Sequence, residues 1–241
     1  MRALSNADFL TIWENGHRLH PLDRGLLAIR ASLPETPGGR VADESVADWT
    51  LGRRNLALAE LRTLYFGPRL EGWTACGQCG EKLEFEVDCR KLAETYEETS
   101  GQPVAFHGST FRLPTSRDLA RIAGETDSQR AALLLLQNCT IDPAASEPAR
   151  WSQSEIEEIA EKMALADPLA EITLGFECPV CQHTSEEILD LSSFLWAEIE
   201  SRAKRLLLEI HALASSYGWA ESAILAMSDV RRATYLQMVQ A

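Results

Sequence analysis

The chain has 241 residues and a formal net charge of −13, with 45% hydrophobic and 24% charged residues. This composition is typical of a folded protein with a sizeable core, and it excludes a chain that is disordered throughout. An acidic balance also makes nucleic-acid binding an unfavourable hypothesis, because such binding depends on neutralising phosphates. Residues 1–19 lack the apolar core of a signal peptide, and the longest apolar run, 131–136, is too short for a bilayer. We therefore expect a cytoplasmic protein without a membrane span.

Residues 1–70 are predicted to form an N-terminal helical region. Apolar residues recur at helical spacing through residues 1–35, with a second helical stretch beginning after Pro21. Residues 34–40 are rich in proline and glycine and are expected to form a loop. A further helix is predicted over residues 46–65, where five leucines recur, and Gly67-Pro68 should end it.

Residues 71–100 carry the first zinc knuckle and a strand. Cys76 and Cys79 form a Cys-x-x-Cys motif inside residues 73–80, which we interpret as a tight glycine-rich turn. Residues 82–88 then alternate polar and apolar side chains, which is the period of a strand. A helix or turn is expected over residues 90–98.

Residues 101–170 are predicted to be a helical insertion. It should open with a hairpin at 104–113, turning at His107-Gly108-Ser109, and continue through an N-cap at 114–118 into a helix. Residues 127–139 should form another helix. After a loop at 142–149, Ser152 or Ser154 can cap a helix over 155–166, since acidic residues crowd its first turn.

Residues 171–192 carry the second zinc knuckle, with a strand entering at 172–176 and another leaving at 185–191. Superposing Cys178 on Cys76 places Cys181 on Cys79 and Asp190 on Asp88. An aromatic residue also precedes each knuckle, Trp73 in the first copy and Phe176 in the second. The two segments therefore resemble an internal repeat.

The two knuckles together predict one structural zinc site with the ligands Cys76, Cys79, Cys178 and Cys181. Zinc prefers a tetrahedron of soft ligands, and Cys-x-x-Cys spacing supplies two thiolates from one turn. The fold class expected is mainly α with a small β zinc-ribbon-like element, whose two knuckles are joined across the helical insertion. The 98 residues between Cys79 and Cys178 are tolerable because loop-closure cost grows only logarithmically.

Three other interpretations of the cysteines stay open. The pairs could be separate free dithiols, or a thioredoxin-type redox centre, although neither pair opens a helix in a βαβ setting. A catalytic zinc with His183 as an additional ligand is the third. Cys89 and Cys139 have no partner at motif spacing, so we expect both to be buried.

Residues 193–241 form a C-terminal helical segment with breaks at Gly218 and Ser228. Its apolar residues recur at three- and four-residue spacing, which fits either a domain core or a face that docks a partner protein. We expect the candidate partner-binding residues of this segment to be His211, Tyr217, Trp219, Arg231, Arg232 and Tyr235.

A family resemblance is found in this segment. Residues 209–236, with a His, a Tyr-Gly-Trp turn, an Ile-Leu-x-Met-Ser step and an Arg-Arg pair, resemble a helical segment in small proteins of contractile phage tails and related contractile injection systems. Residues 111–119 are similar to the Leu-Pro-Thr/Ser step of baseplate hub assembly chaperones from contractile-tailed phages. The resemblance implies a baseplate component or assembly factor that binds baseplate, hub or spike proteins.

Three functions are weighed on these grounds. The first is a non-enzymatic structural or assembly protein of a contractile injection system, which could also be incorporated into a phage-tail-like particle. The alternative is a zinc-ribbon adaptor in transcription or nucleic-acid metabolism, which the acidic charge disfavours. An enzyme is the third, but the sequence holds no P-loop, Gly-x-Ser-x-Gly, His-Glu-x-x-His or dinucleotide-binding fingerprint. We therefore expect no enzymatic activity and no nucleic-acid partner.

Overall fold

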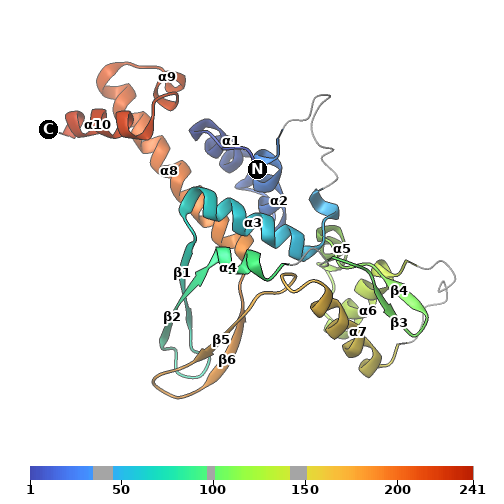
Figure 1. Cartoon of the computed structure of the whole chain (residues 1–241). Helices are drawn as coiled ribbons and strands as arrows, with labels where there is room; N and C mark the ends of the chain where they lie inside the picture. The colour runs from blue at the N-terminus through green and yellow to red at the C-terminus, as the bar shows by residue number, and fades with distance from the viewer. Residues whose placement is uncertain (35–45, 97–100, 142–150, 241) are drawn as a thin grey trace. The chain divides into compact units, whose positions relative to one another are not determined.

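The computed structural model describes residues 1–34, 46–96, 101–141 and 151–240, which divide into two compact units. The terminal unit combines Met1–Val41 with Ser192–Ala241, and the central unit is Ala42–Leu191. Within the described ranges the chain is mainly helical, and its strands pair in small two-stranded antiparallel sheets (Figure 1). The predicted region 1–70 is therefore divided, because its first two helices belong to the terminal unit and its third helix to the central unit.

All regular secondary structure in the described residues of the terminal unit is helical. Ser5 begins the first helix through a capping box with Asp8, and Pro21 occupies the first turn of the second, where its missing N–H is not needed. Gly218, at φ +67°, follows the long eighth helix and lets the chain turn. The helices are α1 (Asn6–Gly16), α2 (Pro21–Ser32), α8 (Leu191–Tyr217), α9 (Glu221–Leu225) and α10 (Asp229–Gln240).

The core of the terminal unit forms where α1, α2 and α8 bury their apolar faces. A Cβ at Gly16 would lie 2.5 Å from the Trp196 ring, so α1 and α8 approach closely at this glycine. Arg202 on α8 donates a hydrogen bond to the Asn6 side chain at 2.9 Å. The fully buried large side chains here, each worth roughly 1.5–3 kcal/mol, are Phe9, Ile12, Ile29, Leu195, Ile199, Leu206 and Leu213.

In the central unit, α3 (Leu51–Phe66) is followed by a hairpin of β1 (Arg69–Ala75) and β2 (Lys82–Asp88), and then by α4 (Cys89–Glu94). Thr50 caps α3 by accepting a hydrogen bond from the Arg53 N–H, so this helix begins five residues later than the predicted 46–65. Only a short 3-10 turn, Val46–Asp48, precedes it. The predicted end of α3 at Gly67 is confirmed.

One sequence prediction around the first knuckle is wrong. Residues 73–75, expected in a turn, are the end of β1, which pairs with β2 from Arg69 opposite Asp88 to Ala75 opposite Lys82. Gly72 and the glycines after Cys76 indicated a turn, but cross-strand pairing overrides the low strand propensity of one glycine. The expected boundary between residues 70 and 71 therefore falls inside a strand.

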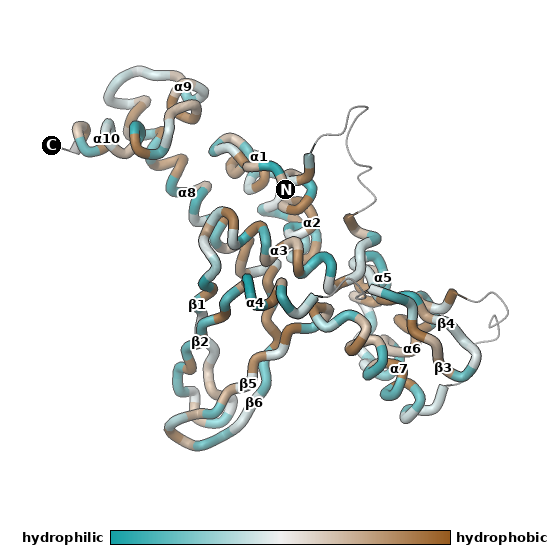
Figure 2. Tube along the Cα trace, viewed as in Figure 1, coloured by the Kyte–Doolittle hydropathy of each residue, from teal (hydrophilic) through white to brown (hydrophobic). Residues whose placement is uncertain are grey.

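The inserted segment between the knuckles has a core of its own. It contains β3 (Val104–Phe106), β4 (Ser109–Phe111), α5 (Ser116–Ile122), α6 (Ser128–Cys139) and α7 (Gln153–Ala166), so the predicted hairpin and helices are confirmed. Ser152 is the residue that caps α7. The predicted loops at 35–40 and 142–149 lie outside the described residues. Apolar stretches in these elements (Figure 2) supply the buried core residues Val104, Phe106, Phe111, Leu113, Leu136, Cys139, Ile156, Ile159 and Met163.

Buried polar contacts hold the end of the insertion against the start of α3. The Asp167 carboxylate, 1% exposed, accepts a hydrogen bond from the Gly52 N–H at 2.8 Å, where a helix N-terminus favours negative charge. The Asn55 side chain donates to the Leu169 carbonyl at 2.8 Å. These contacts fix the direction in which the chain leaves α7 and enters the second hairpin.

Replacing Gly52 with alanine tests this contact. A Cβ at this position would lie 1.8 Å from Asp167 Oδ1, so either the carboxylate or α3 must shift. We expect Gly52→Ala to lower the free energy of unfolding by about 2 kcal/mol, measured by urea denaturation. Gly124→Ala is the control, since its Cβ meets nothing within 4 Å. An equal, small effect of both substitutions would contradict the close packing.

Candidate metal centre

Each cysteine pair lies at the tip of a two-stranded hairpin. Cys76 directly follows β1, and Cys178 directly follows β5 (Thr173–Glu177), which pairs with β6 (Thr184–Ile188). The strands predicted at 172–176 and 185–191 are thus confirmed, with bounds shifted by one to three residues. Polar and apolar residues alternate along β2 and β5, as strands with one inward face require, whereas β6 is polar up to Ile188.

The two tips have the same backbone hydrogen bonds. The Cys76 N–H donates to the Glu81 carbonyl at 2.8 Å, and the Cys178 N–H donates to the His183 carbonyl at 2.9 Å. Gly80 and Gln182 occupy equivalent positions, and both have positive φ, +76° and +60°. The repeat predicted from the sequence is therefore a repeat of backbone geometry, in which one copy uses glycine and the other a strained glutamine.

The aromatic residues noted in both copies are not equivalent. The spacing of the cysteines places Trp73 on Gly175 and Thr74 on Phe176. Trp73 is exposed, whereas Phe176 packs against the cysteine cluster and lies edge-on to Phe85, with ring centroids 5.8 Å apart. This aromatic pair joins the inner faces of the two hairpins.

The four predicted cysteines meet at one point between the tips. Their sulfur atoms all lie within 4.8 Å of one another, with Cys76 and Cys181 at 3.6 Å and Cys79 and Cys178 at 3.5 Å. Sulfurs in a disulfide are about 2.05 Å apart, and all four cysteines are free. Around a tetrahedral zinc with bonds of 2.3 Å, neighbouring sulfurs are about 3.8 Å apart. The cluster therefore has the dimensions of a site that could hold a metal ion.

The cluster is shielded on its inner side and open on the outer side. Cys76 and Cys178 are 3% and 0% exposed and pack with the buried Leu83, whereas Cys79 is exposed. His183 is exposed, and it is not part of the ligand cluster found among the described residues. The donor set consists of four thiols.

The pKa values of the Cys76, Cys79 and Cys181 thiols are shifted in different directions. The backbone N–H groups of Cys79 and Gln78 donate to the Cys76 sulfur and lower the pKa of Cys76 to about 6. The Glu81 N–H also favours a Cys79 thiolate, but the Cys181 thiol and desolvation outweigh it and raise the pKa of Cys79 to about 12. The pKa of Cys181 is raised in the same way by desolvation and the Cys178 thiol, despite the His183 N–H. Four sulfurs this close cannot all be ionised without a cation.

Metal binding should therefore release protons. At pH 7.5 the thiols of Cys79 and Cys181 are protonated, so we expect Zn²⁺ to displace at least two protons per chain. Affinity should fall as the pH falls, because more protons then compete with the metal. Titration of the metal-free chain with Zn²⁺ in weakly buffered phenol red measures the release. Release of fewer than two protons would contradict the assignment of these thiols.

The two cysteines outside the motifs are buried, as predicted. Cys89 is 1% exposed at the start of α4, and Cys139 is 0% exposed in the core of the insertion. Burial raises the pKa of Cys139 to about 11, so this thiol stays protonated and unreactive near neutral pH.

The candidate partner-binding residues lie in the terminal unit. Tyr217 and Trp219 stack with centroids 4.5 Å apart, and Trp219 meets Tyr235 edge-on at 4.8 Å. The Arg231 guanidinium lies 5.7 Å from the Tyr235 ring centroid, and His211 is exposed on α8. The three rings form an aromatic cluster that joins the end of α8 to α10.

Arg232 differs from its neighbour Arg231. Its side chain is 5% exposed and donates to Glu209 at 2.6 Å and to Asp229 at 2.7 Å. This guanidinium is therefore engaged inside the terminal unit, where it connects α8 and α10. Adjacent arginines cannot both face the core of a helix pair, and the sequence alone does not tell which one does.

Comparison of the chain with protein-family models, curated proteins and solved structures finds no match. Among the described helices, none is both long and apolar enough to cross a lipid bilayer.

Proposed function

We propose that the cysteine cluster holds one structural zinc ion, bound by Cys76, Cys79, Cys178 and Cys181. Four thiolates fill a tetrahedral zinc shell and leave no position for a substrate or an activated water, which is the arrangement of structural sites. The ion would neutralise the negative charge of the four thiolates, which would otherwise repel one another at these distances. It would also join the two hairpins in a zinc-ribbon-like clasp, across the insertion.

We further propose that the chain is a non-enzymatic structural or assembly component of a contractile injection system. This proposal is supported by the positions of the residues that carry the family resemblance. Tyr217, Trp219 and Tyr235 come together in one partly exposed aromatic cluster, with the Arg231 side chain beside it. Aromatic residues and arginine are enriched in the energetic centres of protein interfaces. We expect the partners to be baseplate, hub or spike proteins, met in the cytoplasm or in the assembled particle.

A role as a nucleic-acid adaptor is less well supported. The strands and turns of the two hairpins, residues 69–88 and 173–188, contain eight acidic residues against two basic ones, Arg69 and Lys82. Phosphate-binding surfaces need the opposite balance. Salt-dependent binding of DNA or RNA by the purified chain would reverse this preference.

Metal analysis tests the clasp. Purified protein should contain one zinc per chain, and Cys76→Ser or Cys178→Ser should lose it and unfold at lower urea concentration, because metal binding and folding are coupled. Cys139→Ala is the control, since this cysteine is buried far outside the cluster and should leave the zinc content unchanged. Two zinc ions per chain, or none, would contradict one joined site.

Affinity purification from the native host, followed by mass spectrometry, tests the assembly role. The tagged chain should recover baseplate, hub or spike proteins, and Trp219→Ala should reduce that recovery because it removes the centre of the aromatic cluster. Leu165→Ser, which changes an 83% exposed side chain on α7, should not. Normal particle assembly in a deletion strain, with no such protein recovered, would refute the proposal.

A further inference from the structure

The outer face of the β1–β2 hairpin is mostly charged. Because side chains alternate along a strand, Leu70 and Leu83 point to the buried side, while the residues between them on the other face are solvent-accessible. That outer face carries Arg69, Glu71, Trp73 and Ala75 from β1, and Lys82, Glu84, Glu86 and Asp88 from β2.

Trp73 is the one large apolar side chain on this face. Its side chain is 62% exposed and stands directly opposite Glu84 in the strand register. Beside it lies a hollow with a volume of about 500 Å³. Tryptophan is highly buried on average, and here its ring is accessible to a partner from the side of the hollow. The hollow is lined by Glu71, Gly72, Trp73, Lys82, Glu84, Phe85 and Glu86.

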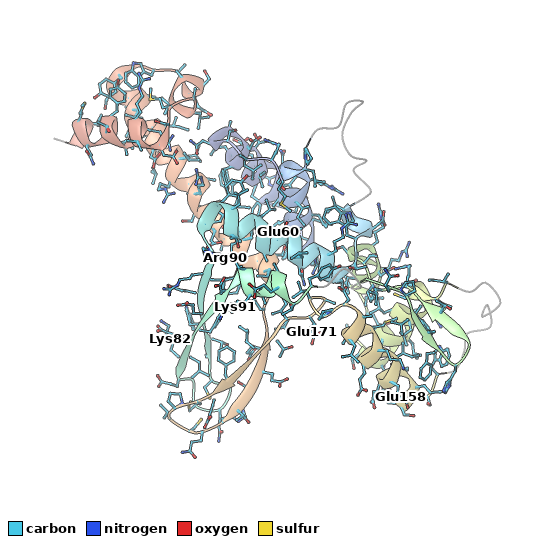
Figure 3. The ribbon with its side chains drawn as sticks, viewed as in Figure 1. Glu60, Lys82, Arg90, Lys91, Glu158 and Glu171 are labelled. Carbon is cyan, nitrogen blue, oxygen red and sulfur yellow. The ribbon has the colours of Figure 1, made fainter. Side chains whose placement is uncertain are left out.

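A cation already occupies one edge of this hollow. The Lys82 ammonium, on β2 (Figure 3), lies 5.7 Å from the centroid of the Trp73 ring and 2.7 Å from the Glu84 carboxylate. Glu86 is paired with Arg69 at 3.3 Å, at the other end of the face. The position of Lys82 shows that the Trp73 ring and the Glu84 carboxylate can contact one basic side chain together. Three carboxylates against Lys82 and the neighbouring Arg69 leave the hollow with a net negative charge.

The second hairpin lacks this combination. Gly175 occupies the position of Trp73 and stands opposite Glu186, just as Trp73 stands opposite Glu84. A carboxylate is therefore common to both hairpins, but an indole is present only on the first. The first hairpin is therefore distinguished by an indole within an acidic face, and not by acidity alone.

We propose that the outer face of the β1–β2 hairpin binds an arginine-containing basic segment of a partner protein. The guanidinium would stack on the Trp73 indole and donate to Glu84 and Glu71, displacing the Lys82 ammonium. Arginine fits better than lysine, because its planar group can stack on a ring and bind carboxylates at the same time. The inference rests on the proposed role as a partner-binding protein, and it specifies the chemistry of one partner.

Fluorescence anisotropy with a fluorescein-labelled (Arg-Ser)₄ peptide and the full chain tests this site. Trp73→Thr should weaken binding at least about fivefold, and Glu84→Gln should also weaken it. Glu186→Gln removes the same charge from the equivalent position of the second hairpin and should leave affinity within about twofold of wild type. Lys82→Gln removes the internal competitor and should strengthen binding, an effect that loss of fold cannot produce.

Two results would contradict the proposed arginine site. Equal weakening by Glu84→Gln and Glu186→Gln, with no effect of Trp73→Thr, would show attraction by net charge only and overturn the proposal. So would the absence of peptide binding by the wild type. Metal content and circular dichroism of Trp73→Thr verify that its hairpin is intact. If the inference fails while Trp219→Ala still abolishes partner recovery, the assembly role stands without this site.

Discussion

The convergence of four thiols from two hairpins is the constraint on which the central unit depends. Closing the 98 residues between Cys79 and Cys178 into a loop costs about 4 kcal/mol of chain entropy. A structural zinc bound by thiolates contributes roughly 10–16 kcal/mol of apparent binding free energy. The binding free energy of the proposed metal therefore exceeds the entropy cost of bringing together two segments so far apart in the chain. The inner contact of Phe85 with Phe176 adds little by comparison, and it serves to orient the hairpins.

Polar contacts before the base of the second hairpin connect the two ends of the insertion a second time. Asp167 and the Leu169 carbonyl are held against the start of α3 by Gly52 and Asn55, just before the second hairpin starts. The insertion itself has its own apolar core, so it can be long without loosening the clasp. The second hairpin is in this way fixed at both ends, by buried hydrogen bonds near the start of α3 and by the cysteine cluster at its tip.

The sequence predicted the cluster well because its signals are local. Cys-x-x-Cys spacing and the alternation of residues 82–88 identify two knuckles without knowledge of the fold. The sequence does not predict β1, since Gly72 and the turn residues after it indicate a turn, and the strand is stabilised by its pairing with β2. The contact of Asp167 with Gly52 spans 115 residues, and no local pattern reveals it. Likewise, helical periodicity could not separate the buried Arg232 from the exposed Arg231.

The two hairpins share the residues proposed to bind the metal, and they differ in the residue proposed to bind a partner. Both copies conserve within this chain the backbone of the tip, the cysteines and one outward carboxylate, and they differ in the aromatic residue on the outer face. X-ray absorption spectroscopy at the zinc edge, measured on the full chain, tests most directly whether the two tips share one metal site. One joined site predicts four sulfur neighbours at about 2.3 Å from each zinc. Two sulfurs with nitrogen or oxygen neighbours would show that the knuckles bind metal separately, and would contradict the clasp.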